Sequence, residues 1–341
     1  MYVDIVIDPM LLGFTMWHYI QSTLGMIFNG ALIYLCLYKT PTVIQTYAVL
    51  ILNFAITDFI CCIMEWLSQI RIISAGELCT FLYNGLCTYF GGMVCFTCHD
   101  ILLHAYSHSL YSLLLSFAYR HYVLYHAQPK RTHLLLIIFL IYIPSGFQNI
   151  VYFTAPDPPE LVVIALKNRF PDYDLENKTI MGLLDIAHNW KALFADMHIC
   201  LAVVPVYIAI LILRHKTISK LRESATIMST NTQTMHRQLL MALTWQAILP
   251  AIFSIAVISY SLTRLDIAHY PFFEYLVFIL VGLIPMTSPL IQLYYVRSYR
   301  KQIIRKFFYW QINCEKQIQP TTSTTSNNWI QTGAISNDQT K

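Results

Sequence analysis

Seven long apolar stretches follow one another along this chain of 341 residues. A helix needs about 20 mostly apolar residues to cross the hydrocarbon core of a bilayer, and in lipid only helices and closed barrels satisfy all backbone hydrogen bonds. The stretches therefore predict an all-α membrane protein, a seven-transmembrane helix bundle. The predicted spans cover residues 15–38, 44–68, 97–123, 132–153, 193–213, 238–262 and 272–296.

The low charge content agrees with a membrane environment. Asp, Glu, Lys and Arg make up 12% of the residues, and hydrophobic residues make up 56%. Soluble domains carry about 25% charged residues, so this chain has too few to cover a globular surface with water-facing groups. The basic residues form no patch with a nucleic-acid-binding motif, which predicts membrane lipid and no nucleic acid among the partners.

The placement of Lys and Arg predicts the orientation. One side of the predicted membrane holds sixteen of these residues and the other holds six. The richer side is cytoplasmic by the positive-inside rule, so the N-terminus is expected outside. The cytoplasmic sixteen are Lys39, Arg120, Lys130, Arg131, Arg214, Lys216, Lys220, Arg222, Arg237, Arg297, Arg300, Lys301, Arg305, Lys306, Lys316 and Lys341.

One glycosylation motif agrees with this orientation. Asn177-Lys178-Thr179 is an N-glycosylation sequon in the long loop between the fourth and fifth spans. Such a site is used only on the outer side of the membrane, where the charge count puts this loop. An unused asparagine is the alternative.

The segments outside the bundle have distinct patterns. Residues 1–14 are predicted to form a short extracellular N-terminus. Residues 298–310 place aromatic and basic side chains on different faces of a helix, which is typical of a short amphipathic helix on the inner membrane surface. Polar residues 311–341 are expected to form a disordered cytoplasmic tail, and Cys314 is either palmitoylated or a free thiol.

Two ionisable residues inside the spans are costly in lipid and therefore informative. Asp58 lies near the middle of the second span, and Asn29 and Ser109 are plausible polar neighbours in the first and third. These residues form either a polar switch cluster or a protonated Asp that only packs helices. Arg120 lies at the inner end of the third span, as a switch residue or as an ordinary cationic anchor.

The third span carries a polar stripe. Asp100, His104 and His108 recur every four residues, which places them on one helical face, with His99 beside them. We interpret the stripe as facing a ligand or the bundle, with Asp100 and His104 as candidate ligand contacts. The alternative is a metal-dependent membrane hydrolase that adds His188 on the outer side.

Nine cysteines are present, and three of them are candidates for a disulfide. Cys79 and Cys87 lie in or near the first outside loop, where the compartment is oxidising. The sequence leaves two pairings open, a local bridge between these two residues and a bridge from this region to Cys200.

Several of these segments resemble rhodopsin-like G-protein-coupled receptors. Leu52-Asn53-Phe54-Ala55-Ile56-Thr57-Asp58 is similar to the second-span motif, and Tyr119-Arg120-His121 matches the central arginine of the third-span triplet. Ser288-Pro289 resembles the start of the seventh-span motif, and residues 298–310 match the eighth helix. In closer detail, residues 15–310 resemble the nematode serpentine receptor class delta chemoreceptors. The carrying segments include residues 50–58, 107–117, 119–124, 142–145 and 235–240.

The resemblance implies a rhodopsin-like architecture and a role for each matched residue. A small-molecule odorant or pheromone would bind in the outer half of the bundle, and a heterotrimeric G protein would couple at the inner face. Arg120, Tyr119 and Pro289 would form the coupling switch. Asn29, Asp58, Ser109 and Ser288 would form the polar core pocket. The resemblance further implies a chemosensory receptor at the plasma membrane, in sensory cilia, which is not an enzyme and needs no cofactor or metal.

Two departures from the receptor pattern are visible. Tyr119 replaces the acidic residue that normally pairs with the following arginine, and Ser288 replaces the usual asparagine. The main alternative function is a seven-span ligand-gated ion channel of the insect odorant-receptor type. That class has its N-terminus inside, against the charge count of this chain.

Overall fold

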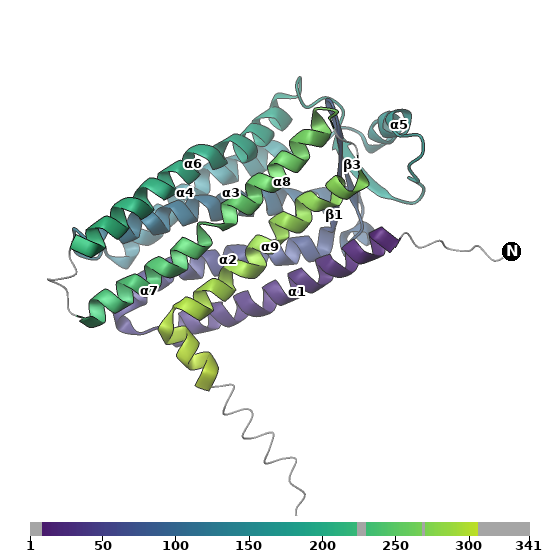
Figure 1. Cartoon of the computed structure of the whole chain (residues 1–341). Helices are drawn as coiled ribbons and strands as arrows, with labels where there is room; N and C mark the ends of the chain where they lie inside the picture. The colour runs from purple at the N-terminus through teal and green to yellow at the C-terminus, as the bar shows by residue number, and fades with distance from the viewer. Residues whose placement is uncertain (1–8, 224–229, 268–269, 306–341) are drawn as a thin grey trace, which may run out of the picture. The chain divides into compact units, whose positions relative to one another are not determined.

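The computed structural model describes residues 9–223, 230–267 and 270–305, and it confirms the bundle of seven spans (Figure 1). Six spans are formed by α1, α2, α3, α4, α6 and α9, and α7 and α8 follow each other as the remaining one. The helices are α1 (Pro9–Tyr38), α2 (Gln45–Ser68), α3 (Gly92–Tyr122), α4 (Arg131–Phe153), α5 (Pro159–Arg169), α6 (Trp190–Glu223), α7 (Thr230–Gln246), α8 (Leu249–Arg264) and α9 (Pro271–Tyr295).

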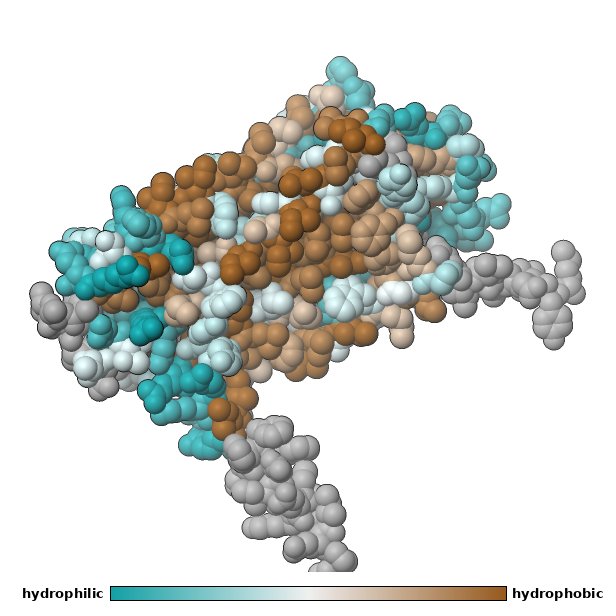
Figure 2. Space-filling model, viewed as in Figure 1, coloured by the Kyte–Doolittle hydropathy of each residue, from teal (hydrophilic) through white to brown (hydrophobic). Residues whose placement is uncertain are grey.

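The outer surface of the bundle is apolar, as Figure 2 shows for one face. On α4, for example, Phe139 is 64% exposed and Ile150 is 70% exposed. Large apolar side chains at this exposure are matched to lipid rather than water. Within the described residues, six helical stretches are long and apolar enough to cross a membrane. α3 is not one of them because of its polar side chains, yet it packs against α2, α4 and α6.

Prolines interrupt some spans and not others. The sixth span breaks after Gln246, and Pro250 is the second residue of α8. Proline has no N–H to donate, so it removes one helix hydrogen bond. α9 stays helical through Pro285 and Pro289. Such helices persist where neighbouring helices satisfy the carbonyl that each proline leaves free.

A three-stranded antiparallel sheet lies at one end of the bundle, where the sequence predicted only loops. Its strands are β1 (Ile70–Ala75), β2 (Leu78–Tyr83) and β3 (Thr179–Leu183). Gly76 has φ of 61°, a left-handed conformation that allows the two-residue turn between β1 and β2. A search for stretches of 20 apolar residues misses six-residue strands. We call this end the sheet end, and the opposite end, where α3 finishes, the Arg120 end.

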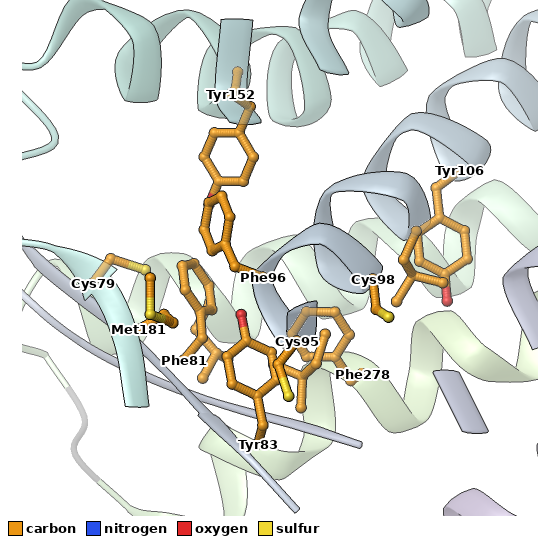
Figure 3. Packing of buried hydrophobic residues seen from close by; sticks show 14 of the residues in the cluster. Cys79, Phe81, Tyr83, Cys95, Phe96, Cys98, Tyr106, Tyr152, Met181 and Phe278 are labelled. Atoms are coloured by element: carbon orange, nitrogen blue, oxygen red, sulfur yellow. The ribbon is translucent and has the colours of Figure 1, made fainter. Parts of the chain in front are cut away.

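Buried side chains from the strands and helices pack together beneath the sheet. Figure 3 shows this cluster, in which Phe81 of β2 lies near Phe96 of α3 and Phe278 comes from α9. The ring centroids of Phe81 and Phe96 are 6.4 Å apart, and Tyr152 of α4 lies 5.2 Å from Phe96. The sheet is therefore joined to the bundle by aromatic packing that involves three helices.

The disulfide differs from both predicted pairings. Cys87, in the 3-10 helix η2 (Leu86–Phe90), is bonded to Cys95 in the first turn of α3, with 5.0 Å between their Cα atoms. Cys79 and Cys200 are free thiols. The prediction missed Cys95 because it started the third span at residue 97, whereas α3 starts at Gly92 and places Cys95 next to the preceding loop.

The chain ends differ slightly from the predicted boundaries. α1 starts at Pro9, so the predicted extracellular segment 1–14 includes its first turns. Residues 297–305 are helical, in agreement with the start of the predicted amphipathic helix. Tyr299 in this helix is fully buried, and its hydroxyl lies 3.0 Å from Thr40 Oγ1. Residues 306–310, the predicted tail 311–341 and its Cys314 lie outside the described residues.

Candidate functional site

Arg120 is buried at the end of α3, with only 4% of its surface exposed. Its guanidinium carbon lies 3.5 Å from the centre of the Tyr47 ring on α2 and 5.9 Å from the Tyr119 ring. The Arg120 Nε and Nη2 atoms have no hydrogen-bond partner within the described residues. The face of an aromatic ring attracts a cation, so Tyr47 gives Arg120 a partner in the absence of an acidic residue at position 119.

A chain of buried amides extends from the Arg120 end toward the middle of the bundle. Gln292 Nε2 of α9 donates to Gln246 Oε1 at 2.8 Å, and Gln246 Nε2 donates to Ser288 Oγ at 3.0 Å. Gln246 is the last residue of α7, directly before the break in the sixth span. These bonds therefore connect the proline-containing α9 to the place where the sixth span bends.

Asp58 lies beyond Ser288 along the same interior. Its Oδ1 accepts a hydrogen bond from Ser109 of α3 at 3.4 Å, and Ser288 approaches the same carboxyl group. Its Oδ2 has no hydrogen-bond partner within the described residues. The structure thus brings together three members of the predicted polar pocket, Asp58, Ser109 and Ser288.

Asn29, the fourth member, contacts the proline-containing part of α9. Its Nδ2 donates to the carbonyl oxygens of Gly25 and Pro285, both at 2.9 Å. Pro289 has no N–H for the carbonyl of residue 285, four positions earlier, so that oxygen lacks its helical partner. The Asn29 amide replaces the missing bond, which gives Pro289 and Asn29 a joint structural role.

A cavity lies directly beneath the sheet, with an empty volume of about 730 Å³ including its open margin. Its walls come from β1, β2 and β3, from the sheet-end halves of α3, α6, α8 and α9, and from the end of α4. Most lining side chains are apolar or aromatic, among them Phe81, Leu103, Phe253, Ala256 and Phe278. A concave apolar site with a few polar groups is typical of small-molecule binding.

Few polar groups face this cavity. Asp196 of α6 lines it and forms an ion pair with Arg264 of α8, with 2.5 Å between the Asp196 Oδ2 and Arg264 Nη1 atoms. The ring of His99 lies 4.3 Å from that of Phe81, and its Nδ1 lies 3.5 Å from the Tyr83 hydroxyl. The lining carboxylate is thus already neutralised, and His99 offers a second ring nitrogen, Nε2, among aromatic rings.

A second cavity adjoins the first toward the middle of the bundle. The two share Tyr106, Ile199 and Phe253 as lining residues. Ser109, Gln246 and Ser288 also line the second cavity. The space beneath the sheet therefore leads to the polar chain described above.

Asp100 and His104, the predicted ligand contacts, line neither cavity. Both face α4 instead. His104 stacks against His108 and lies 5.5 Å from the Tyr142 ring, and Asp100 is 1% exposed near Asn149. The spacing correctly predicted one shared helical face, but α4 covers that face. His99, one position before Asp100, lines the cavity in their place.

The alternative of an intramembrane metal hydrolase receives no support from the described part of the chain. His99 lies among aromatic rings, and His108 Nε2 contacts Asn53 of α2 and Ser112 of its own helix at 3.2 and 3.1 Å. His99, Asp100, His104 and His108 therefore do not converge with one another or with His188. The described residues include one group of three metal-ligating side chains, Glu77, Asp185 and His188, and it lies at the sheet end.

The sequence analysis missed a buried contact between a histidine and a glutamate near the sheet end. His18 of α1 and Glu65 of α2 are 2% and 1% exposed, and His18 Nδ1 lies 2.7 Å from Glu65 Oε1. Gln21 Nε2 lies 3.4 Å from the same His18 nitrogen. A Cβ atom at Gly282 of α9 would collide with Gln21 Nε2 and lie 3.5 Å from Glu65 Oε1. The absence of a side chain at Gly282 thus allows α9 to pack closely over this group.

Sequence reasoning also missed Tyr47, Gln246 and Gln292. None of them is charged, so a search for ionisable residues within apolar stretches passes over them. A search for amides and tyrosines between the depths of Asp58 and Arg120 would have found them. Glu65 and His18 carry the stronger signal, since ionisable residues are rare inside spans.

The fold is a seven-transmembrane helix bundle of the rhodopsin type. The crystal structure of squid rhodopsin matches with a TM-score of 0.58 and 17% identity, over 91% of this chain and 89% of that chain, a likeness that concerns the fold alone. Residues 14–305 match the profile of the family described as serpentine type 7TM GPCR chemoreceptor Srd, and the chain belongs to this family.

Relatives from Caenorhabditis elegans agree. Serpentine receptor class delta-19 is 40% identical over 300 residues, which cover 87% of this chain and 88% of the relative. Serpentine receptor class delta-18 is 39% identical over 87% of this chain and 89% of the relative, and delta-3 is 34% identical over 85% and 86%. Family membership confirms the predicted resemblance and favours a receptor over a seven-span channel.

Proposed function

We propose that this chain is a chemosensory G-protein-coupled receptor of the plasma membrane, which binds a small molecule at the sheet end and activates a heterotrimeric G protein at the Arg120 end. One observation carries the proposal. The cavity beneath the sheet adjoins a second cavity lined by Ser109, Gln246 and Ser288, and Gln292 extends this chain toward Arg120. A ligand and a G protein would thus act on the two ends of one connected interior.

The ligand follows from the lining of the first cavity. Its walls are mostly apolar, and the carboxylate among its lining residues, Asp196, is paired with Arg264. A charged ligand would lose its hydration without gaining a free counter-charge. The ligand is therefore a largely apolar, uncharged molecule, an odorant or pheromone in the context of this family, with a polar group that can pair with His99.

The switch lies in the sixth and seventh spans. Gln246 stands at the break between α7 and α8, and Ser288 and Gln292 flank Pro289 of α9. We distinguish a resting state and an active state in which these spans have moved. A ligand that binds the active state more tightly shifts the equilibrium toward it, and the difference in affinity sets the size of the shift. Release of Arg120 from the Tyr47 ring would open the inner face to the G protein.

Filling the cavity should weaken the response. Ala256 of α8 lines the cavity and is 1% exposed, so Ala256→Leu places a larger side chain where the ligand would lie. We expect the concentration of a screened agonist that gives half-maximal signalling to rise at least about tenfold, or about 1.4 kcal/mol. Ala251→Leu, on the exposed face of the same helix, is the matched control. Equal potency for wild type and Ala256→Leu, at matched surface level, would place the ligand elsewhere.

Orientation in intact cells tests the proposal as a whole. Antibodies should reach an N-terminal tag without permeabilisation and a C-terminal tag only after it. Asn177 is exposed next to β3 at the sheet end, so wild type should shift on glycosidase treatment and Asn177→Gln should not. An N-terminus inside the cell would overturn the receptor proposal and favour the ion channel.

A further inference from the structure

The sheet end brings a histidine and two carboxylates together from two distant parts of the chain. Glu77 lies in the turn between β1 and β2, and Asp185 and His188 lie in the turn between β3 and α6. One ligand atom from each side chain lies within 4.8 Å of the others. Among the described side chains this group is distinct from both cavities, and neither family membership nor the proposed function assigns it a role.

The strand register explains why the two acids meet. Cys79 of β2 is paired with Leu183 of β3 in an antiparallel ladder. The ladder ends at this pair, and Glu77 and Asp185 each lie two residues beyond it at the same edge of the sheet. The Ile186 amide donates to the Glu77 carbonyl oxygen at 3.1 Å, which fixes the two turns against each other.

Two carboxylates held this close repel each other unless a cation lies between them. Neither Glu77 nor Asp185 has a Lys or Arg partner within the described residues. Asp185 instead accepts the His188 backbone N–H at 2.8 Å, a bond within its own turn. A cation between the two carboxylates would relieve their repulsion.

His188 supplies the third ligand and the selectivity. Its Nδ1 lies 2.7 Å from Asp185 Oδ2, and its Nε2 remains for another partner. A mixed set of one imidazole and two carboxylates suits zinc, whereas calcium and magnesium require oxygen ligands. A site with three protein ligands leaves room for water as the fourth.

We propose that Glu77, Asp185 and His188 form a binding site for one divalent transition-metal ion of the zinc type on the sheet end. The ion would join the β1–β2 turn to the β3–α6 turn. Ile186, between Asp185 and His188, lines the cavity beneath the sheet. A bound ion would therefore hold part of the cavity wall in place.

Zinc binding to the purified full chain tests this proposal. The protein carries a tag without histidines, and bound zinc is measured by equilibrium dialysis. We expect one saturable zinc ion per chain, with calcium unable to compete. His188→Ala and Glu77→Gln should each weaken binding at least about tenfold, since even the loss of an outer partner of a metal ligand costs that much. His133→Ala, an exposed histidine of α4, should bind like wild type.

A second measurement needs no variant. Zinc should protect His188 of the wild-type protein from modification by diethyl pyrocarbonate, as read by peptide mass, and should leave His133 reactive. The proposal is wrong if His188→Ala binds zinc as tightly as wild type, if calcium binds equally well, or if zinc does not protect His188.

Discussion

Replacing Arg120 with alanine should abolish agonist-driven signalling while the amount of receptor at the cell surface stays unchanged. Arg120 is buried at the end of α3, where its guanidinium stacks on Tyr47. A desolvated cation over a ring is worth about 2 kcal/mol. The contact with the Tyr47 ring thus offsets part of the cost of burying the Arg120 cation. A contact with the G protein could replace it. Agonist-stimulated nucleotide exchange on the G protein, at matched surface level, measures the effect.

Two comparisons make this expectation specific. Arg131→Ala removes an exposed arginine from the same end of the bundle and should signal like wild type. Tyr47→Phe keeps the ring beneath the guanidinium, and Tyr47→Leu removes it. If Tyr47 holds Arg120 in the resting state, Tyr47→Leu should raise signalling without agonist, whereas Tyr47→Phe should not. Undiminished signalling by Arg120→Ala would remove the role that we assign to this residue.

Removing either member of the His18–Glu65 pair should destabilise the receptor by about 3–5 kcal/mol. Both side chains are almost completely buried, and Glu65 has no partner other than His18 within the described residues. Glu65→Ala therefore leaves a buried imidazole without its partner, and His18→Ala leaves a buried glutamate side chain without its partner. Thermal unfolding of the purified receptor in detergent measures the loss.

The double variant distinguishes two causes of instability: a buried polar group left without its partner, and the lost attraction between His18 and Glu65. Replacing both members with leucine removes both costly groups, and such replacements are often neutral or stabilising. The double variant should therefore be more stable than either single alanine variant. Glu160→Ala, at an exposed acid on α5, should change the free energy of unfolding by no more than about 0.5 kcal/mol. Single variants as stable as wild type would contradict the expected cost.

The seven spans were predictable because lipid imposes strict requirements on a chain. Each crossing needs a helix of a minimum length, and each ionisable residue within it must have a reason to be there. The same requirement singles out Asp58 and Arg120 by their positions within apolar stretches. The polar third span was predictable too, although its composition alone is too polar to identify it as a crossing.

The sheet and the disulfide were not predictable in the same way. β1, β2 and β3 are each only five or six residues long, and β3 lies about a hundred residues further along the chain from its partner. The residues around β2 and β3 do not specify that these strands pair. The pairing forms because the helix bundle brings the two loops together. Cys95 became the partner of Cys87 because α3 starts earlier than the apolar pattern suggests.

The sequence by itself determined the class of this protein: seven helices in a membrane, polar residues at particular depths and a basic end. The tertiary structure decided which side chains meet. Spacing shows that Asp100 and His104 share a helical face, yet only packing shows that α4 covers it and that His99 borders the cavity. The tertiary structure likewise decided that Tyr47 lies beneath Arg120. The spacing of residues in a sequence shows which of them share a helical face, but not which other helix that face contacts.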